Sequence, residues 1–262
     1  MSYTPKLNAV FGARDANSYV TVEEASASLA VRDGGGAWQA MERDRPADEA
    51  LKRREQLLAT ASRLVDTPTY RYARFFSYER GFAHVQALKF PWAAHPYLYA
   101  RAAGGTKGTL VVEALARPDL YPDGFFVGGA VHVRRGKNRH AARAVSGFDG
   151  ATGTLSVSPD FEETPDQATE FYVLWAPDSA LKDAVIEQAY HLLLANPHGE
   201  AGELDDAAEL SADGIASASV AGVPIQLDVA PGDRRAGVPA LCNVARLLLR
   251  PYLARSADAG RA

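Results

Sequence analysis

A short basic segment near the middle of the chain has residue types that attract phosphate. Its basic cluster surrounds His140 and consists of Arg134, Arg135, Lys137, Arg139 and Arg143. Clustered arginine and lysine side chains neutralise phosphate groups and raise the local concentration of anions. The segment therefore predicts either a surface beside DNA or a protein partner, or a solvated loop, which is the common structural role of a charge run.

A second stretch interleaves aromatic and basic side chains. Its rings are Tyr70, Tyr72, Phe75, Phe76 and Tyr78, and its arginines are Arg71, Arg74 and Arg80. Rings and arginines in this arrangement can stack single-stranded bases. The alternative, which we favour, is a connector that packs its rings on a helical core or a neighbouring subunit and keeps its arginines in water.

An acidic stretch follows in the last third of the chain. It contains no basic residue and consists of Glu200, Glu203, Asp205, Asp206, Glu209 and Asp213. The charges indicate a solvated loop or a surface that repels phosphate.

The common catalytic motifs are absent. The sequence has no G-x-x-x-x-G-K-[ST], G-x-G-x-x-G, H-E-x-x-H or G-x-S-x-G segment. The single cysteine, Cys242, lies in an apolar stretch and is expected as a small buried side chain, so neither a disulfide nor a zinc site is predicted. We expect no catalytic residue, no metal, no cofactor and no enzymatic activity, and the alternative is an active site assembled from distant residues.

The composition is that of a globular protein. The chain has 262 residues, of which 47% are hydrophobic and 23% charged, with a net charge of −4. A negative balance argues against a protein whose main role is to coat nucleic acid. We find no signal peptide and no apolar run of the roughly 18 residues that cross a bilayer, so no membrane association is expected.

The N-terminal third has helical periodicity. Thr21 and Glu24 form a capping box, which predicts a helix from Val22 that ends at the glycines of 34–36. A second helix is predicted over 48–66, with the charged residues of 52–55 facing water. A shorter segment at 79–89 is ambiguous between helix and loop.

From about residue 109 the apolar period becomes two, which indicates strands. Strands are predicted at 109–113, 125–133, 141–145, 154–157 and 170–175, with turns at 121–124 and 147–150. His132 and His140 lie on either side of the basic loop and are expected as a solvated pair. Several short strands with such turns predict a small antiparallel β-barrel or sandwich.

Helical periodicity returns at Asp178 and continues to about Asn196. A weak hairpin is predicted within 215–227, and a final helix over 239–250 is apolar on several sides, which is typical of a buried or docked helix. The fold class is therefore α+β. We expect a helical bundle domain formed by 1–96 and 177–262, interrupted by an inserted β domain at 97–176.

Several segments resemble a family of tailed-phage proteins, the head–tail connector adaptors that complete the head beneath the portal. The resemblance lies in Ala16–Ala25, in Leu57–Asp66, in Gln86–Trp92 and in the C-terminal segments 214–222 and 247–253. The family usually has an arginine where this chain has Trp92. Segments 124–130, 147–157 and 164–166 resemble a small β-barrel module of phage structural proteins, which the ordinary adaptor lacks. Some relatives are labelled single-stranded-DNA-binding proteins, which is the alternative function.

The resemblance implies a structural virion protein at the neck, made in the host cytoplasm. Such adaptors form a closed ring, commonly of twelve copies, beneath the portal and around the DNA channel. The implied partners are the portal protein, a tail, stopper or tail-terminator protein, further copies of the chain, and DNA that passes without sequence-specific contact. The residues implied to dock on the portal are Leu247, Leu248, Leu249, Pro251, Tyr252 and Leu253. The acidic stretch is expected to face the channel.

Overall fold

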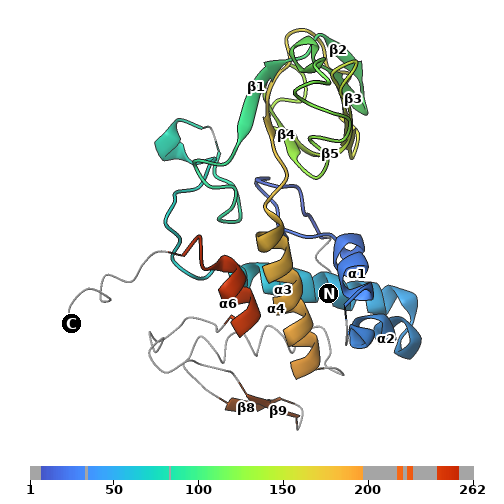
Figure 1. Ribbon diagram of the computed structural model, residues 1–262, viewed down its shortest axis with the longest axis vertical. Helices are drawn as coiled ribbons and strands as arrows, with labels where there is room; N and C mark the ends of the chain where they lie inside the picture. The colour runs from blue at the N-terminus through green and yellow to red at the C-terminus, as the bar shows by residue number, and fades with distance from the viewer. Residues whose placement is uncertain are drawn as a thin grey trace, which may run out of the picture. The chain divides into compact units, whose positions relative to one another are not determined.

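The computed structural model describes residues 7–32, 35–82, 84–196, 217–220, 223–226 and 241–253 (Figure 1). The chain divides into two compact units. The first unit comprises Met1–Ala9, Asn17–Arg71 and Ser179–Ala262, and the second comprises Val10–Ala16 and Tyr72–Asp178. The α+β class is confirmed. The division differs from the expected one because 10–16 and 72–96 group with the strands.

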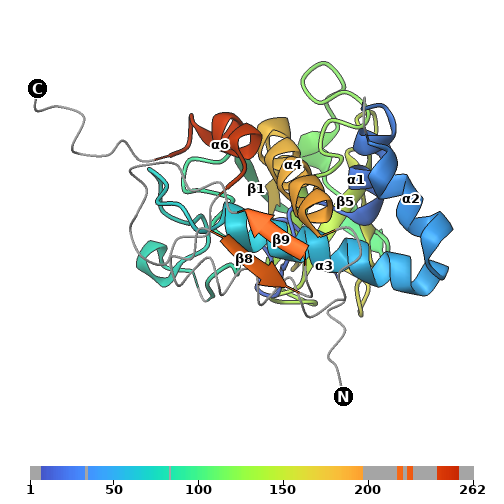
Figure 2. The same ribbon diagram turned by 90° about the horizontal axis from the view of Figure 1, so that it is seen from below.

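Helices form the described core of the first unit. They are α1 (Val22–Ala30), α2 (Gly36–Asp44), α3 (Ala47–Val65), α4 (Ser179–Ala195) and α6 (Asn243–Leu249). The predicted capping box is confirmed, because the Thr21 hydroxyl accepts from the Glu24 N–H and the Glu24 carboxylate accepts from the Thr21 N–H. Helix α4 packs against both α3 and α6, and Figure 2 shows α6 beside α4.

Helix α2 was not expected from the sequence. The glycines of 34–36 predict only the end of a helix, yet α1 already ends at Ala30 and a new helix begins at Gly36. Trp38 and Met41 on α2 are buried, so packing against the rest of the unit stabilises a helix that begins with a poor helix former.

The prediction that 52–55 faces water is wrong for two of its arginines. Arg53 and Arg54 are only 2% and 6% exposed. Arg54 donates to the Trp38 carbonyl at 2.8 Å and pairs with Glu42, while Arg53 donates to the Asn196 carbonyl at 3.1 Å. Neighbouring elements cover this side of α3, and hydrogen bonds compensate for burying the charges.

The C-terminal half of the first unit adds two shorter features. Helix α6 is shorter than predicted, and the Cys242 thiol accepts from the Ala245 N–H at its start. Strands β8 (Ser217–Val220) and β9 (Val223–Gln226) form an antiparallel pair, which confirms the predicted hairpin.

A seven-stranded antiparallel sheet forms the second unit. Its strands are β1 (Tyr97–Arg101), β2 (Gly104–Thr106), β3 (Thr109–Val111), β4 (Ala130–Arg135), β5 (Ala142–Asp149), β6 (Thr154–Ser158) and β7 (Glu170–Leu174). The strand order is β1-β7-β4-β5-β6-β3-β2. Strands β1 and β2 lie at the two ends, so the described sheet is not a closed barrel, which was one of the two expected forms. Its core includes Leu110, Val131, Leu155 and Phe171.

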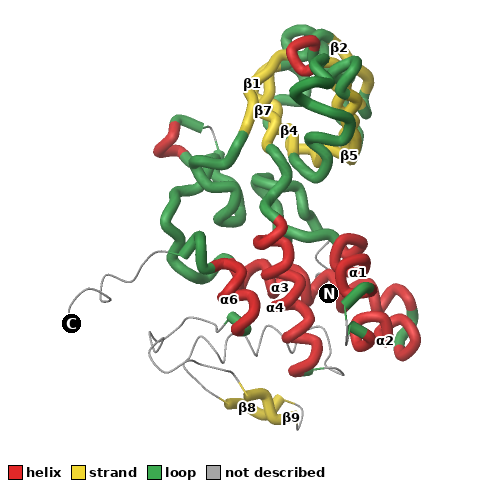
Figure 3. The backbone as a smooth tube through the Cα atoms, viewed as in Figure 1, coloured by secondary structure: helices red, strands yellow, loops and turns green. Residues whose placement is uncertain are grey.

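One segment differs from its predicted form, and a second is the one whose pattern was ambiguous between helix and loop. Residues 125–129 form turns instead of the start of a strand, since Gly124 and Gly128 adopt φ of 78° and 82°, and the strand begins only at Ala130. Among the described residues of 79–89, the only helical ones belong to the end of a 3₁₀ helix, Tyr78–Arg80, and most of the described part of 72–96 is loop (Figure 3). Within the described residues, no helix has the length and apolar character needed to span a membrane.

Candidate functional site

The second unit contains a basic and aromatic pocket of about 470 Å³ beside the β4–β5 hairpin. Its lining includes the arginines Arg80, Arg134, Arg135 and Arg139, the histidines His84, His132 and His140, and the rings Phe76, Phe82 and Tyr172. No carboxylate is among the described residues that line it. The structure thus brings three arginines of the basic cluster together with Phe76 and Arg80 of the aromatic and basic stretch.

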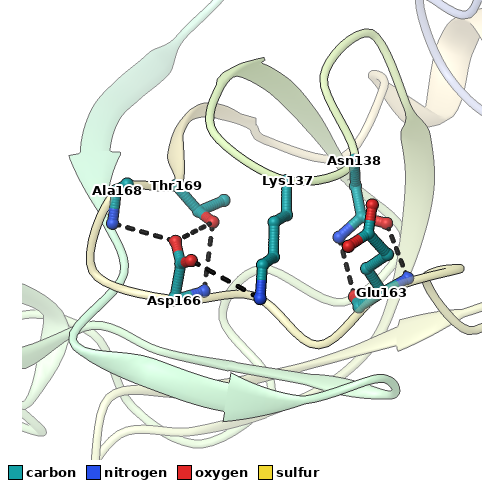
Figure 4. Close-up of polar contacts among 6 residues, drawn as sticks. All are labelled: Lys137, Asn138, Glu163, Asp166, Ala168 and Thr169. Atoms are coloured by element: carbon teal, nitrogen blue, oxygen red, sulfur yellow. Dashed lines mark hydrogen bonds and ion pairs between the residues drawn. The ribbon is translucent and has the colours of Figure 1, made fainter.

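The tip of the β4–β5 hairpin is held in place by a reciprocal pair of hydrogen bonds. The Asn138 side-chain amide donates to the Glu163 carbonyl at 2.7 Å, and the Glu163 N–H donates to the Asn138 side-chain oxygen at 2.9 Å (Figure 4). Asn138 has φ of 61°, a left-handed conformation that asparagine tolerates better than most residues. The clamp fixes the backbone that leads directly into Arg139 and His140.

Gly136 allows the same hairpin to lie close to a neighbouring loop. Its φ is 83°, and a Cβ added there would lie 2.7 Å from the Ala168 carbonyl oxygen. Only glycine fits this backbone without displacement of one of the two segments.

Lys137 belongs to the basic cluster but does not line the pocket. Its ammonium lies 3.7 Å from the Asp166 carboxylate, which also accepts from the Ala168 N–H at 3.0 Å and the Thr169 hydroxyl at 3.3 Å (Figure 4). Lys137 therefore contacts the loop that supports the hairpin, whereas Arg139, two residues further along the chain, lines the pocket.

The arginine side chains that line the pocket differ in their hydrogen-bond and aromatic contacts. Arg80 donates to the Phe75 carbonyl at 2.9 Å, and its guanidinium lies 5.7 Å from the centre of the Phe82 ring. The Arg134 guanidinium lies 5.6 Å from the centre of the Tyr99 ring. Within the described part of the chain, neither Arg134 nor Arg139 forms an ion pair with a carboxylate. Their charge is thus available to a ligand.

Arg135 is the pocket arginine that a carboxylate partly neutralises. It lies 3.7 Å from Glu170, which also pairs with Arg101 at 3.1 Å and accepts a hydrogen bond from the Tyr99 hydroxyl. The Tyr99 hydrogen bond, followed by that of Arg101, lowers the pKa of Glu170. This carboxylate therefore stays ionised beside the pocket.

The histidines are held close to the aromatic rings. His84 stacks on Phe76 with centroids 5.0 Å apart, and burial, then Arg14 and His140, lower its pKa. His132 is 4% exposed, and burial lowers its pKa to about 4. The expectation that His132 is solvated is wrong, because it lies 4.4 Å from Phe76 between ring centroids.

The remaining predicted site residues lie elsewhere. Arg143 donates to the Asp160 carbonyl at 3.2 Å and lies over the Phe161 ring, away from the pocket lining. Sequence reasoning missed His84, Phe82 and Tyr172, whose spacing carries no motif. Asn138 follows Gly136 closely, and this pair of residue types was a usable signal for a left-handed turn.

The C-terminal segment has a mixed environment. Leu247 is 66% exposed, Leu248 is half-buried and Leu249 is 0% exposed. The chain after α6 is hydrogen-bonded to Arg71, which follows α3 in the sequence. The Arg71 side chain donates to the Leu253 carbonyl at 2.6 Å, and the Arg71 N–H donates to the Tyr252 carbonyl at 3.1 Å. Because it is 0% exposed, the Leu249 side chain is part of the core of the first unit.

The acidic stretch at 200–213 lies outside the described residues. Among the residues that are described, no group of three or more His, Cys, Asp or Glu side chains is arranged to hold a metal ion. The chain matches no protein-family model, no curated protein and no solved structure.

Proposed function

We propose that this chain is a structural virion protein, a head-to-tail adaptor that forms a ring beneath the portal of a tailed phage. The proposal rests on the ordered resemblance described above. The N-terminal resembling segment contains the capping box of α1, the segment Leu57–Asp66 makes up the end of α3, and the last segment begins within the final turn of α6. The resembling segments thus overlap parts of three helices of the same unit.

One structural observation supports the proposal beside the resemblance, namely the exposed apolar face of α6. Val244 and Leu247 are 46% and 66% exposed, whereas Ala245 and Leu249 are buried. Residues three apart lie on the same side of a helix, so the two exposed side chains form a small apolar surface opposite the packed side. In this proposal the two side chains form the apolar centre of the contact with the portal protein.

In a ring, each subunit contacts its two neighbours through two different surfaces. Cyclic assemblies use heterologous contacts, in which one surface of a subunit binds a different surface of the next. In this proposal α6 contacts the portal protein, and other surfaces of the chain contact the next copy and a tail or stopper protein. DNA passes through the ring without sequence-specific contact.

The test is the mass of the full chain by light scattering, alone and after mixing with a purified portal ring. We expect a saturable complex with about one chain per portal subunit. The double variant Val244→Asp with Leu247→Asp should abolish the complex, because it places two charges in an apolar contact.

Leu51→Asp is the matched control. It makes the same chemical change at a leucine of the same unit that is 47% exposed on α3. Portal binding that survives the α6 variant, or a chain that ignores the portal altogether, would overturn the proposal.

A further inference from the structure

We infer that the pocket of the second unit binds a nucleotide unit, with its phosphate on the arginines and its base against the aromatic rings. This site goes beyond the adaptor function, because it uses none of the residues assigned to portal docking. It also lies wholly among residues of the second unit.

The charge of the lining favours a phosphate group. Four arginines surround about 470 Å³, and Glu170, the carboxylate that pairs with Arg135, is shared among Arg101, Arg135 and the Tyr99 hydroxyl. Arg134 and Arg139 have no carboxylate partner within the described residues. Guanidinium groups bind phosphate through two parallel hydrogen bonds, so an anion would supply the acceptors that the protein does not.

The backbone of the site is already in position. The Asn138–Glu163 clamp and the close approach of Gly136 to Ala168 hold the hairpin that carries Arg139 and His140. A ligand that binds a preformed site orders fewer groups on binding, which improves its affinity.

The aromatic side of the pocket favours a flat ring on the same ligand. Phe82 and Tyr172 are half-buried, and their ring centroids lie 5.5 Å apart at 68°. Each base of a nucleic acid offers a π face to such rings, at about 1–3 kcal/mol per stacked base. The volume lies within the range of about 300–1,000 Å³ that holds small ligands. An inorganic anion would leave this aromatic side unused, so a nucleotide satisfies both halves of the pocket.

His84 supplies a local probe of occupancy. Burial, the Arg14 charge and His140 all lower its pKa, so its imidazole favours the neutral form. The groups that face it are Arg14, His132, His140 and the Phe76 ring. A bound phosphate would oppose the cationic neighbours, and the pKa of His84 should therefore rise on binding.

The experiment titrates the full chain with three probes, which are adenosine monophosphate, inorganic phosphate and a single-stranded oligothymidylate. Binding is measured by calorimetry and by the NMR signals of the His84 imidazole. We expect the nucleotide to bind at least about tenfold more tightly than phosphate, because only the nucleotide reaches the rings.

The two sources of a nucleotide are distinguished by the oligonucleotide. Tighter binding of the strand, with a steep dependence on salt, would identify the ligand as a unit of single-stranded nucleic acid. Equal or tighter binding of the monophosphate would identify a free nucleotide. Both outcomes support the site, provided that the signals of His84 move.

Arg139→Gln and Lys137→Gln form a matched pair of variants. Each removes one positive charge from the same hairpin, but only Arg139 lines the pocket, while Lys137 pairs with Asp166. We expect Arg139→Gln to weaken binding at least about tenfold and Lys137→Gln to change it less than about twofold. Circular dichroism and thermal unfolding verify that both variants fold.

Three results would overturn the inference. They are no binding of any probe to the wild-type chain, equal binding of phosphate and nucleotide, and equal losses in the two variants. The portal experiment is unaffected by each of them, because it depends on α6 of the first unit.

Discussion

The Nε2 of His132 donates a hydrogen bond to the main-chain carbonyl of Phe11 over 2.8 Å, although the two residues are 121 positions apart in the sequence. A carbonyl only accepts hydrogen bonds, so the proton of the neutral imidazole lies on Nε2. This bond ties Phe11 to β4, and with the hydrogen bond from the Ala87 N–H to the Ala13 carbonyl it connects Val10–Ala16 to the second unit.

The buried imidazole predicts a loss of stability in mild acid. The pKa of His132 is lowered from 6.5 to about 4, chiefly by burial. Between pH 6.5 and 4 the unfolded chain binds a proton that the folded chain does not, so the free energy of unfolding falls as the pH falls. The full effect of this group is about 3 kcal/mol. Urea unfolding at several pH values measures it.

His132→Gln removes the titrating group and retains an amide that can donate to the Phe11 carbonyl. The slope of unfolding free energy against pH should decrease near pH 5 by roughly 1.4 kcal/mol per pH unit, which corresponds to one proton. An unchanged slope in this variant would show that His132 does not control the acid sensitivity.

At the hairpin tip, Asn138 contributes to the free energy of unfolding in two ways that can be measured separately, through its hydrogen bonds to Glu163 and through its tolerance of a left-handed φ. Asn138→Gly loses both hydrogen bonds to Glu163 but keeps a residue suited to φ of 61°, and we expect a loss of about 1–2 kcal/mol. Asn138→Ala should lose about 1 kcal/mol more, since alanine is strained in the left-handed region. Chemical denaturation of the two variants gives both values. Equal stability of the glycine variant and the wild type would contradict the clamp.

Substitution of Gly136 and of Gly124 by alanine would strain the backbone at both positions, but only at Gly136 would the added Cβ also clash with another segment. Both have left-handed φ, but a Cβ meets the Ala168 carbonyl only at Gly136 and meets nothing within 4 Å at Gly124. Each change to alanine costs about 1–2 kcal/mol from φ alone. Gly136→Ala should cost a further 1–3 kcal/mol or so from overpacking. Thermal unfolding of the pair checks the order, and the opposite ranking would refute the close approach.

The buried contacts of Arg54 predict that it stabilises the fold, although a charged residue is usually exposed. Its side chain is 7% exposed, pairs with Glu42, donates to the Trp38 carbonyl and lies 5.5 Å from the Trp38 ring centre. Arg54→Ala should lower the free energy of unfolding by about 1–3 kcal/mol, because it removes charged hydrogen bonds and a packed stem.

Lys52→Ala is the control for Arg54 on the same helix. Lys52 is 50% exposed and pairs with Asp48 at 3.6 Å, a surface contact worth about 0.5 kcal/mol or less. Equal losses in the two variants, measured by urea unfolding, would mean that Arg54 contributes no more than a surface charge.

The sequence by itself determined those elements whose signals are local. The Thr21 and Glu24 capping box lies within four residues, and it predicted the start of α1 correctly. The spacing of apolar residues predicted α3, α4 and the strands β3, β5, β6 and β7. Apolar residues recur about every 3.6 positions on the packed face of a helix and every second position on the packed face of a strand, so this signal lies within each element. The α+β class follows from the order of these periods along the chain.

Only the tertiary structure decided which side chains meet and which are covered. Arg53 and Arg54 carry the pattern of a solvated face, yet the elements packed around α3 bury them. The candidate pocket combines residues from 76–84, 132–140 and 172. The residue pattern within one of these segments does not predict that it contacts the other two. Strand pairing of β4 with β5 and β7 brings 132–140 and Tyr172 together, and the packing of Phe76 on His132 joins segment 76–84 to them. Such contacts depend on the packing of distant segments, which the local pattern of a single sequence does not contain.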